Sequence, residues 1–548
     1  MTMRLRRFTH PAAVLLAIGL ALLVGAAADA QTTQWAATRT GAYPISGAQF
    51  QDVVAPDELI DIVIPLKPRN KESLDKKVLA LITPGSPEFR QYLSHAQVIA
   101  NYVPFYAQAQ RVADYLAQMG FPEVEIADSN LLVKARGPAA AVRHAFNTEL
   151  AHYARAGRVG IVNTTPVQIP AELTDVVDTV LGLQTLDLLK TSSVGQTAID
   201  AGGFPALYGL TGIYKAGQPT PVRVPFSTGA NTVVGIITEG NVTQVLADLK
   251  TAETQQGLQQ LTPTVLNVNG TGPFTDTSNA HEWDIDSQAT LGVASQLAGM
   301  IFYNIGSLTD ANLTLAIEQA VGSNAARIIN MSFGGCEWYF HADNSLGTDD
   351  YYFELATAQG QTFVASSGDT GSNDCSDYGP NGAVGQEYPA ASPYVIAVGG
   401  TSTYVSFPLI IYVSETGWSG SGGGPSTFES MPSWQSGIVP AGGRGVPDIA
   451  FDADPNSGIF VIVGGVQQQW GGTSLAAPLF VGSYARMETA VGNTFGFPGA
   501  ALYSVGKSHP TDFYDVTSGS NGKYSATAGW DYVTGFGRPL LRSLVNDL

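Results

Sequence analysis

The sequence predicts a doubly wound α/β domain with a mostly parallel sheet, preceded by a small α+β domain. Three continuous apolar runs are typical of strands buried on both faces of a parallel sheet, and they lie at 232–238, 325–332 and 361–367. Helical patterns alternate with these runs, at 242–258, 311–322 and 350–359. In a fold of this kind we expect reactive side chains to gather at the carboxyl ends of the strands.

Length and charge divide the chain into two parts. With 548 residues it is too long for a single hydrophobic core. Residues 1–190 carry 17 basic and 17 acidic side chains, whereas residues 191–548 carry 10 and 29 and so hold the whole net charge of −19. An acidic chain is poorly suited to binding nucleic acid, and we expect no such partner.

Residues 1–30 have the pattern of a secretory signal peptide. Three arginines within the first seven residues precede an apolar run at 12–28, and Ala28-Asp29-Ala30 matches a small-x-small cleavage site. The alternative is an uncleaved membrane anchor, since the run approaches the length of a membrane span. No later run is long and apolar enough to span a bilayer. We therefore expect a secreted, extracellular protein with no membrane attachment after signal removal.

Residues 31–190 are expected to form the small α+β domain. Its predicted elements are strands at 58–66 and 129–135 and helices at 71–81, 107–119 and 139–146. No cluster of reactive side chains stands out here, which favours a structural or regulatory role.

A tract rich in Ser, Thr and Gly, Lys190–Gly203, follows the small domain. This composition is typical of an exposed junction that is open to proteolytic nicking. Allowing a few residues of boundary uncertainty, we place the processing junction at 191–206 and the second domain at 207–548.

The stretch Gly-Gly-Thr-Ser-Leu-Ala-Ala-Pro at 471–478 contains a candidate nucleophile. Its two glycines allow a tight turn and the close approach of another chain. The apolar run at 475–481 predicts a helix, so Ser474 would lie at a helix N-terminus, where free N–H groups favour a developing negative charge. A serine in that place can act as a nucleophile if a base lies within reach. The alternative is that Thr473 or Ser474 simply caps the helix.

The candidate base lies in the segment HEWDIDSQA at 281–289, which we expect to open a helix that runs to about Tyr303. Glu282 and Asp286 are four residues apart and so share one helical face. The open alternatives are a solvated surface, a metal site, a glycosidase acid/base pair, and a base with its orienting partner. A metal site is disfavoured because His281 is adjacent to Glu282 rather than one turn away. A glycosidase would place its carboxyl groups on opposite sides of a sugar.

A third carboxyl group, Asp369, follows the strand predicted at 361–367. In its Ser-Gly-Asp-Thr-Gly setting the alternative is an ordinary turn former or cap. The two cysteines of the chain, Cys336 and Cys375, lie after two of the predicted strands. In an exported chain a disulfide is favoured over two free thiols or a metal pair, and it would hold Asp369 in place.

These motifs resemble the sedolisin family, the serine-carboxyl peptidases. The stretch at 471–478 is similar to the nucleophile motif of subtilisins and sedolisins, and HEWDIDSQA has the sedolisin Glu-x-x-x-Asp pattern in place of the subtilisin histidine. The subtilisin aspartate is also missing, because the matching strand ends Ile237-Thr238-Glu239-Gly240. TPGSPEFRQYLS (83–94) and NLLVKARGPAAAVRHAFNTEL (130–150) resemble the family's activation propeptide. The resemblance therefore covers essentially the whole chain after the signal.

The resemblance implies a subtilisin-like catalytic domain and a self-processing precursor of a secreted endopeptidase. In the family pattern Ser474 is the nucleophile, Glu282 the general base and Asp286 its orienting partner, while Asp369 belongs to the oxyanion hole. The expected partners are protein or peptide substrates and the chain's own propeptide, as an intramolecular inhibitor and chaperone, on a monomeric enzyme. The rival hypothesis is an inactive, secreted binding homologue, which the loss of any of these four residues would favour.

One position departs from the family. Some members have a glutamate near Glu239 that contacts the catalytic glutamate, but here the acid is shifted one position along the strand toward the opposite face. We therefore do not assign that role to Glu239.

The C-terminal segment resembles the family's calcium site. The implied ligands of one structural Ca²⁺ are the side chains of Asp515 and Asp531 with the main-chain oxygens of Val516, Thr527 and Gly529. Thr527 stands where many relatives have glycine. Two carboxylates and turn carbonyls suit hard oxygen coordination, although ordinary turns have the same composition.

The replacement of histidine by carboxyl groups predicts activity in acid. We expect an optimum at roughly pH 3–5, which brackets the ordinary pKa values of carboxyl groups, and little activity above neutrality.

Overall fold

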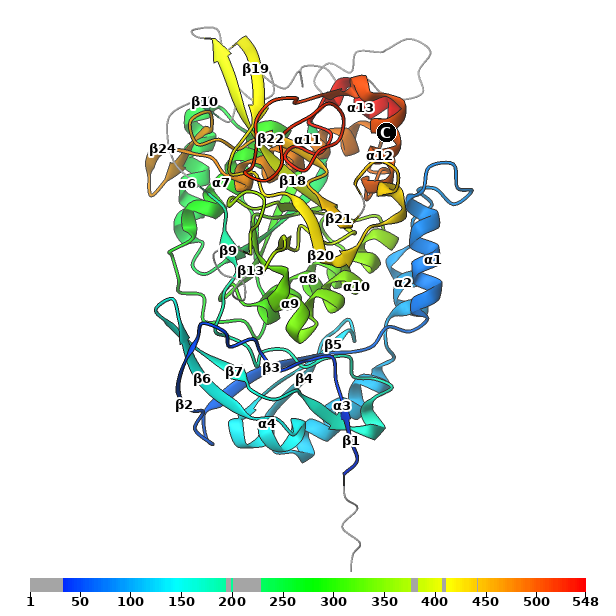
Figure 1. Ribbon diagram of the computed structural model, residues 1–548, viewed down its shortest axis with the longest axis vertical. Coiled ribbons are helices and arrows are strands. Elements are labelled where there is room, and N and C mark those ends of the chain that lie inside the picture. Colours follow the sequence, from blue (N-terminus) through cyan, green and yellow to red (C-terminus); the bar gives the residue numbers. More distant parts are fainter. Residues whose placement is uncertain (1–32, 194–198, 201–227, 376–382, 407–410, 441) are drawn as a thin grey trace, which may run out of the picture. The chain divides into compact units, whose positions relative to one another are not determined.

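A mostly parallel sheet organises the second half of the chain in the computed structural model (Figure 1). The structure describes residues 33–193, 199–200, 228–375, 383–406, 411–440 and 442–548. The sheet order is β12-β13-β11-β14-β16-β18-β19, with β22 also paired to β18, and only the β18–β19 pair of this sheet is antiparallel among the described residues. The strands are β11 (Gly229–Glu239), β12 (Thr264–Asn267), β13 (Leu297–Ile305), β14 (Ile328–Met331), β16 (Thr362–Ser366), β18 (Val395–Ser406), β19 (Ile411–Gly417) and β22 (Ile449–Asp452). This confirms the predicted fold class.

Helices cover the sheet, and the two central ones are buried. They are α6 (Thr243–Gln256), α7 (Ala280–Ala294), α8 (Asp310–Ser323), α9 (Glu337–Asp343), α10 (Ser345–Ala358), α11 (Thr473–Ala490), α12 (Gly499–Ser508) and α13 (Leu541–Asp547). Helix α7 is buried from Glu282 to Ala294 and packs against α11, which is buried from Thr473 to Glu488. Helices of this kind have no face exposed to solvent, so their reactive side chains point into protein rather than into water.

The prediction that the helix opening at His281 runs to about Tyr303 is wrong. Helix α7 ends at Ala294 because Ser295 adopts a left-handed conformation, with φ of 62°, which few non-glycine residues tolerate inside a helix. The apolar residues that follow form β13, which lies between β11 and β12 in the sheet. An apolar stretch of this length fits a buried helix or a buried strand equally well.

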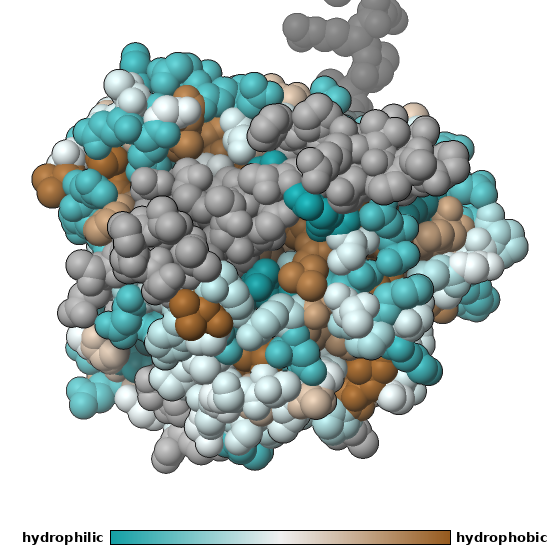
Figure 2. Space-filling model, turned by 90° about the horizontal axis from the view of Figure 1, so that it is seen from above, coloured by the Kyte–Doolittle hydropathy of each residue, from teal (hydrophilic) through white to brown (hydrophobic). Residues whose placement is uncertain are grey.

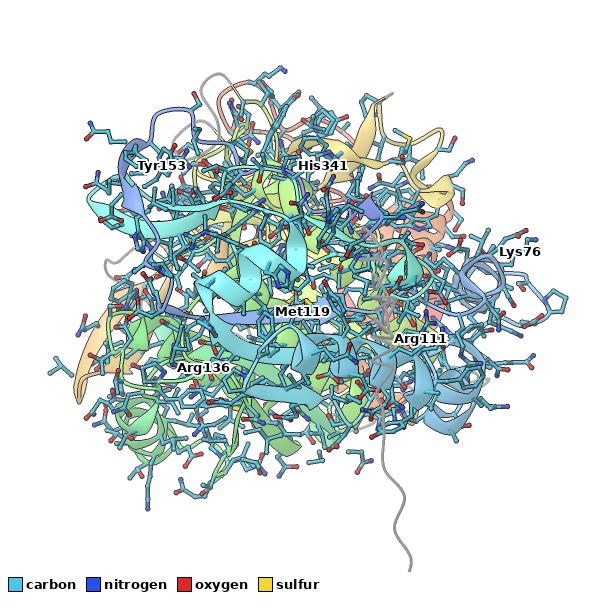
Figure 3. All side chains as sticks on the ribbon, turned by 90° about the horizontal axis from the view of Figure 1, so that it is seen from below. Lys76, Arg111, Met119, Arg136, Tyr153 and His341 are labelled. Atoms are coloured by element: carbon cyan, nitrogen blue, oxygen red, sulfur yellow. A yellow bond between two sulfur atoms is a disulfide. The ribbon has the colours of Figure 1, made fainter. Side chains whose placement is uncertain are left out.

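The small α+β domain forms as predicted, around its own apolar core. Two antiparallel sheets, β3-β5-β4 and β2-β6-β7, pack with the helices, and Figure 3 shows this part of the chain with Arg111, Met119, Arg136 and Tyr153 labelled. Its elements are β1 (Trp35–Ala37), β2 (Gln49–Val53), β3 (Leu59–Pro65), α1 (Lys71–Ile82), α2 (His95–Tyr102), α3 (Tyr106–Gln118), β4 (Glu123–Ile126), β5 (Leu132–Pro138), α4 (Ala139–Phe146), β6 (Leu150–Arg155), β7 (Arg158–Asn163) and β8 (Gln168–Pro170).

Short strands complete the description around the main sheet. They are β9 (Lys190–Thr191), β10 (Ile199–Asp200), β15 (Phe333–Cys336), β17 (Glu387–Tyr388), β20 (Gly424–Ser430), β21 (Gly443–Val446), β23 (Ile459–Val463), β24 (Val466–Trp470), β25 (Phe513–Tyr514) and β26 (Arg538–Pro539). In Figure 2 hydrophobic residues form separate small patches among hydrophilic ones. Within the described part of the chain no helix has both the length and the apolar character to cross a bilayer. The predicted signal peptide, 1–30, lies outside the described residues.

Direct contacts join the small domain to the second domain. Lys71 forms an ion pair with the buried Glu354 at 2.8 Å. The Leu93 N–H donates to the Ala358 carbonyl at 2.9 Å, and the Ser129 hydroxyl donates to Glu318. An ion pair and hydrogen bonds therefore hold the small domain against the second domain.

Candidate active site

Ser474 lies at the N-terminus of α11, as the sequence predicts, and it is fully buried. Its hydroxyl donates to the Ser332 carbonyl at 3.0 Å. The preceding Gly472 has φ of +96°, and a Cβ there would come within 2.0 Å of the Ser192 carbonyl oxygen. Only glycine fits this position, because it both tolerates the backbone angle and leaves room for a second chain.

Glu282 and Asp286 project from one face of α7, and both are 0% exposed. The solvated-surface alternative is therefore wrong. Asp286 Oδ1 accepts a hydrogen bond of 2.6 Å from the Ser332 hydroxyl. Burial raises the pKa of Asp286 to about 8, while the side chains of Ser332 and Asn330 oppose that rise. A fixed carboxyl group thus stands one helical turn behind Glu282.

Glu282 is a buried acid near the Ser474 hydroxyl. Burial raises its pKa well above the ordinary value, and the charge of Asp286 raises it further. The nearby hydroxyls of Ser474 and Ser193 lower it, although neither carboxylate oxygen completes a hydrogen bond of good geometry with a described residue. A raised pKa makes the ionised carboxylate a stronger acceptor for the proton of a neighbouring hydroxyl, which is the property a general base requires.

Asp369 contacts Thr473, the residue that precedes Ser474. Its Oδ1 accepts from the Thr473 N–H and the Thr473 hydroxyl, each at 2.8 Å. Its Oδ2 is buried and has no hydrogen-bond partner among the described residues. Burial raises the pKa of Asp369 well above its ordinary value, against the two Thr473 hydrogen bonds, and Glu387 and Glu282 add to the rise. A protonated Asp369 would therefore carry its proton on Oδ2, free to donate.

The start of the junction tract occupies this site. Strand β9 pairs antiparallel with β15, with Lys190 opposite Gly334 and Thr191 opposite Phe333. Lys190 is exposed, as predicted for the junction, but Ser192 is only 4% exposed, because its backbone hydrogen-bonds to Ser474 inside the site. The remainder of 191–206 lies outside the described residues, apart from Ser193 and β10.

The disulfide between Cys336 and Cys375 forms, with a Cα–Cα distance of 4.9 Å. It ties the end of β15 to the loop that carries Asp369. Asp374, next to Cys375, accepts from the Thr370 N–H at 3.3 Å and from the Thr370 hydroxyl at 2.6 Å. This loop is therefore fixed on both sides of its turn.

Sequence reasoning missed several residues that support the site. They are Ser332 and Asn330 at the end of β14, Thr473 beside Asp369, and Ser192 against Ser474. The sequence did offer a signal for Asn330 and Ser332, because they are two polar residues at the end of an otherwise apolar strand, in Ile-Asn-Met-Ser. Glu239 accepts from the Asn279 amide at 3.0 Å, and its carbonyl accepts from the Trp283 indole at 3.0 Å. It therefore contacts neighbours of Glu282.

The predicted calcium residues lie together in one loop. The Gly529 N–H donates to Asp515 Oδ2 at 3.0 Å, and the Thr527 N–H donates to Asp531 Oδ2 at 2.9 Å. No ion pair between described residues involves either aspartate. Among the described residues there is also no cluster of three or more His, Cys, Asp or Glu that could hold a metal. A cation here would therefore need main-chain carbonyls beside the two carboxylates.

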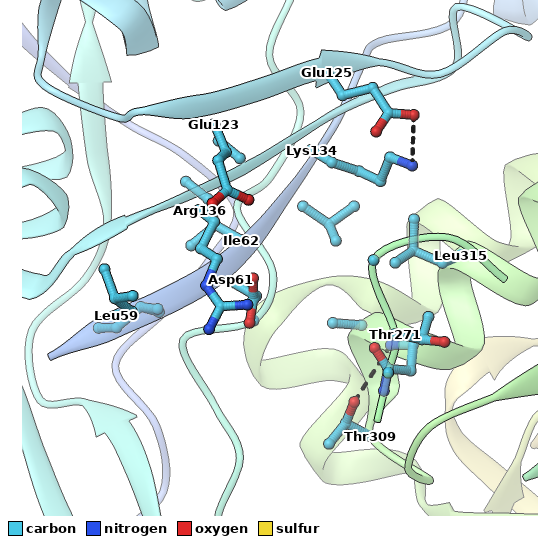
Figure 4. Close-up of a pocket in the computed structure, with 18 of the residues that line it drawn as sticks. Leu59, Asp61, Ile62, Glu123, Glu125, Lys134, Arg136, Thr271, Thr309 and Leu315 are labelled. Carbon is cyan, nitrogen blue, oxygen red and sulfur yellow. Dashed lines mark hydrogen bonds and ion pairs between the residues drawn. The ribbon is translucent and has the colours of Figure 1, made fainter. Parts of the chain in front are cut away.

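Three cavities are bordered by described residues of both the small domain and the second domain, and two of them are larger than the third. One, of about 670 Å³, is bordered by β3, β4 and β5 and by Thr271, Thr309 and Leu315, with an ion pair of 2.9 Å between Lys134 and Glu125 (Figure 4). Its lining includes none of the four candidate catalytic residues. The other, of about 510 Å³, borders Thr191 and Gly335 along the β9–β15 pair, and so it adjoins the chain that enters the site.

A serine at a helix N-terminus, with two buried carboxyl groups on α7 and a third that hydrogen-bonds to Thr473, is the arrangement expected of a serine-carboxyl peptidase on a subtilisin-like fold. Two family models match the chain, "Pro-kumamolisin, activation domain" at 46–186 and "Subtilase family" at 268–499. The chain is 38% identical to sedolisin of Pseudomonas sp. (strain 101), over 96% of this chain and 94% of that protein. It is 34% identical to xanthomonalisin of Xanthomonas sp. (strain T-22), over 94% of this chain and 69% of that protein.

A solved structure agrees with these relatives. The structure of Pseudomonas sedolisin, described as a serine-carboxyl proteinase complexed with two molecules of pseudo-iodotyrostatin, matches with a TM-score of 0.58 at 38% identity. The match covers 64% of this chain and 98% of that one. The chain belongs to the sedolisin family: it is a serine-carboxyl peptidase, a peptide-bond hydrolase that carries an activation domain.

Proposed function

We propose that the protein is a secreted, acid-active endopeptidase made as a self-processing precursor. The observation that carries this proposal is the carbonyl of Ser192, which accepts from the Ser474 N–H at 3.1 Å, while Glu282 lies near the Ser474 hydroxyl and Asp369 hydrogen-bonds to the preceding Thr473. A peptide carbonyl thus sits where a substrate carbonyl would be polarised. The proposed division is a signal at 1–30, an activation propeptide at 31–190, a junction at 191–206 and a catalytic domain at 207–548.

In the proposed mechanism Ser474 Oγ attacks the carbonyl carbon of the scissile bond. Ionised Glu282 takes the hydroxyl proton as general base and later gives it to the leaving amine. Asp286 orients Glu282, and the two carboxyl groups can hydrogen-bond directly only when they share a proton. Protonated Asp369, through Oδ2, and the Ser474 N–H donate to the developing oxyanion.

The propeptide is proposed to act as an intramolecular inhibitor and chaperone on a monomeric enzyme. Support comes from its position, because the chain that follows the small domain fills the space next to Ser474. The Lys71–Glu354 ion pair and the Leu93 hydrogen bond would fix that position until the propeptide leaves.

The test of the proposed function is mass spectrometry of the purified full chain during incubation at about pH 4, close to ordinary carboxyl pKa values. We expect the precursor to lose its first domain and an added unstructured protein to be cut at internal peptide bonds. A chain that stays intact and leaves the substrate whole at every pH from acid to neutral would contradict the proposal and favour a binding homologue.

We further propose that Asp515 and Asp531, with the carbonyls of Val516, Thr527 and Gly529, bind one structural Ca²⁺. The two aspartates lack ion-pair partners among the described residues and are linked by the backbone N–H groups of Thr527 and Gly529. Their remaining lone pairs are oxygen ligands of the kind that Ca²⁺ prefers. Bound Ca²⁺ would hold the C-terminal loop closed without taking part in catalysis.

Calcium removal should therefore lower thermal stability. At free Ca²⁺ about 100 times the dissociation constant, binding adds about 2.7 kcal/mol to the folded state, so a chelator at neutral pH should lower Tm and added Ca²⁺ should restore it. Asp515→Asn should abolish this response, and elemental analysis should find one Ca²⁺ per wild-type chain. An unchanged Tm together with no bound calcium would remove the site.

A further inference from the structure

The segment Lys190–Ser193 lies in the site as an extended substrate would. Lys190 and Thr191 add an antiparallel strand to β15, and strand addition to an exposed sheet edge is a common way of binding an extended peptide. The pairing fixes the register of this segment, because each of the two residues faces one partner. The residue that follows is thereby delivered to Ser474.

Both backbone groups of Ser192 contact Ser474. The Ser192 N–H donates to Ser474 Oγ at 3.1 Å, and the Ser192 carbonyl accepts from the Ser474 N–H at 3.1 Å. The carbonyl carbon belongs to the same residue, so it lies next to the nucleophilic oxygen. The carbonyls of Lys190 and Thr191 belong to the paired strand instead.

The surroundings of Gly472 show how closely the Ser192–Ser193 peptide approaches the start of α11. A Cβ at Gly472 would come within 2.0 Å of the Ser192 carbonyl oxygen, 2.7 Å of Asp369 Oδ2 and 2.8 Å of the Ser193 Cα. The Ser192–Ser193 peptide and the free oxygen of Asp369 therefore border one small space. The hydroxyls of Ser193 and Ser474 also lie near Glu282. The candidate acid, base and nucleophile thus surround a single peptide bond.

We infer that Ser192–Ser193 is the first bond cleaved when the precursor matures. This inference rests on the proposed function, and it assigns that function its first substrate. Ser474 Oγ bonds to the Ser192 carbonyl carbon to give a tetrahedral intermediate while its proton passes to Glu282. The C–N bond to Ser193 then breaks to leave an ester on Ser474, and Glu282 returns the proton to the released nitrogen. One water molecule, deprotonated by Glu282, attacks the ester, the C–O bond to Ser474 breaks, and Glu282 returns the proton to Ser474 Oγ, so the products are a carboxyl group on Ser192 and an amino group on Ser193.

The same contacts would hold the precursor uncleaved. The Ser474 hydroxyl proton is directed to the Ser332 carbonyl, and the Ser192 N–H occupies a lone pair of Ser474 Oγ. Cleavage requires the hydroxyl to turn toward an ionised Glu282. Until it does, the segment blocks the site as an uncleaved substrate.

The test is the N-terminus of the earliest product. Purified full-length protein is transferred to acid, quenched at short intervals and examined by intact mass and N-terminal sequencing. The first new chain should begin at Ser193. A first product that begins elsewhere, from a chain that cuts added substrate, would overturn the inference and leave the proposed function standing. A chain that neither matures nor cuts added substrate would instead contradict the proposed function.

Two substitutions at one position sharpen the result. Ser193→Pro removes the N–H of the leaving group and locks its backbone, so the product that begins at residue 193 should be lost. Ser193→Ala keeps the N–H and should still give a chain that begins at residue 193. If Ser193→Pro matures through the same bond as Ser193→Ala, the inference is wrong. Circular dichroism of both precursors checks that they fold.

Discussion

Ser474→Ala is expected to abolish peptide hydrolysis and to leave the precursor intact at acidic pH. Removal of a serine nucleophile that works with a base costs about 10⁴- to 10⁶-fold in turnover in related mechanisms. The loss should be that large here because the other hydroxyl beside Glu282, that of Ser193, belongs to the junction segment. Folding should survive, since the change removes only the hydroxyl contacts with the Ser332 carbonyl and the Ser192 N–H.

A matched control lies on the same helix. Ser483 is also fully buried in α11, and its hydroxyl has no hydrogen-bond partner among the described residues. Ser483→Ala should mature and cut peptides like the wild type. Peptide release and intact mass, measured on both variants purified free of other proteases, decide the matter. Maturation of Ser474→Ala at the wild-type rate would mean that another group, or another enzyme, cuts the precursor.

Much of the fold follows from continuous apolar runs. Strands β11, β14 and β16 and the helices between them are predictable because a parallel sheet covered on both faces needs such runs. The boundary between α7 and β13 was not, since Leu297–Ile305 is apolar enough for either structure. Its outcome depends on the left-handed turn at Ser295 and on pairing with β11 and β12, which are tertiary effects.

The reactive side chains of the candidate site were predicted from the sequence, but the residues that bury and support them were not. Glu282, Asp286, Asp369 and Ser474 stand in recognisable motifs, but spacing along a helix cannot say whether a carboxyl group is buried. That depends on α11 packing against α7. Ser192 was misjudged because a run of Ser, Thr and Gly suggests exposure, whereas hydrogen bonds to Ser474 hold this residue in the buried site. Backbone contacts between segments so far apart leave no local pattern.

Asp369→Asn is expected to change the pH dependence of activity as well as its rate. Asp369 serves the oxyanion only when protonated, so activity should be lost as pH rises through its pKa. Burial raises that pKa well above the ordinary value, which moves the alkaline limb above the usual range of an aspartate. On the acidic side activity falls when Glu282 is protonated. Because the carboxyl groups interact, each limb reports the group of acids rather than one residue.

An asparagine donates a hydrogen bond at every pH, so Asp369→Asn should keep proportionally more activity as pH rises. Its rate at the optimum should nevertheless fall, because the loss of one oxyanion-hole donor of proper geometry costs about 10²- to 10³-fold. Asp349→Asn is the matched control: this buried carboxyl group also has a raised pKa, but it accepts from Thr314 on α8 and lies outside the candidate site. Its pH profile should be that of the wild type.

The central claim is that carboxyl groups around Ser474 serve as the general base and as an oxyanion-hole donor, in place of a histidine and an amide. The most direct test is kcat/KM measured against pH for the matured wild type and for Asp369→Asn. The account predicts a bell for the wild type with its optimum on the acidic side of neutrality, and an alkaline limb that moves to higher pH in the variant. An identical alkaline limb in both proteins, or a wild-type optimum near neutrality, would contradict it.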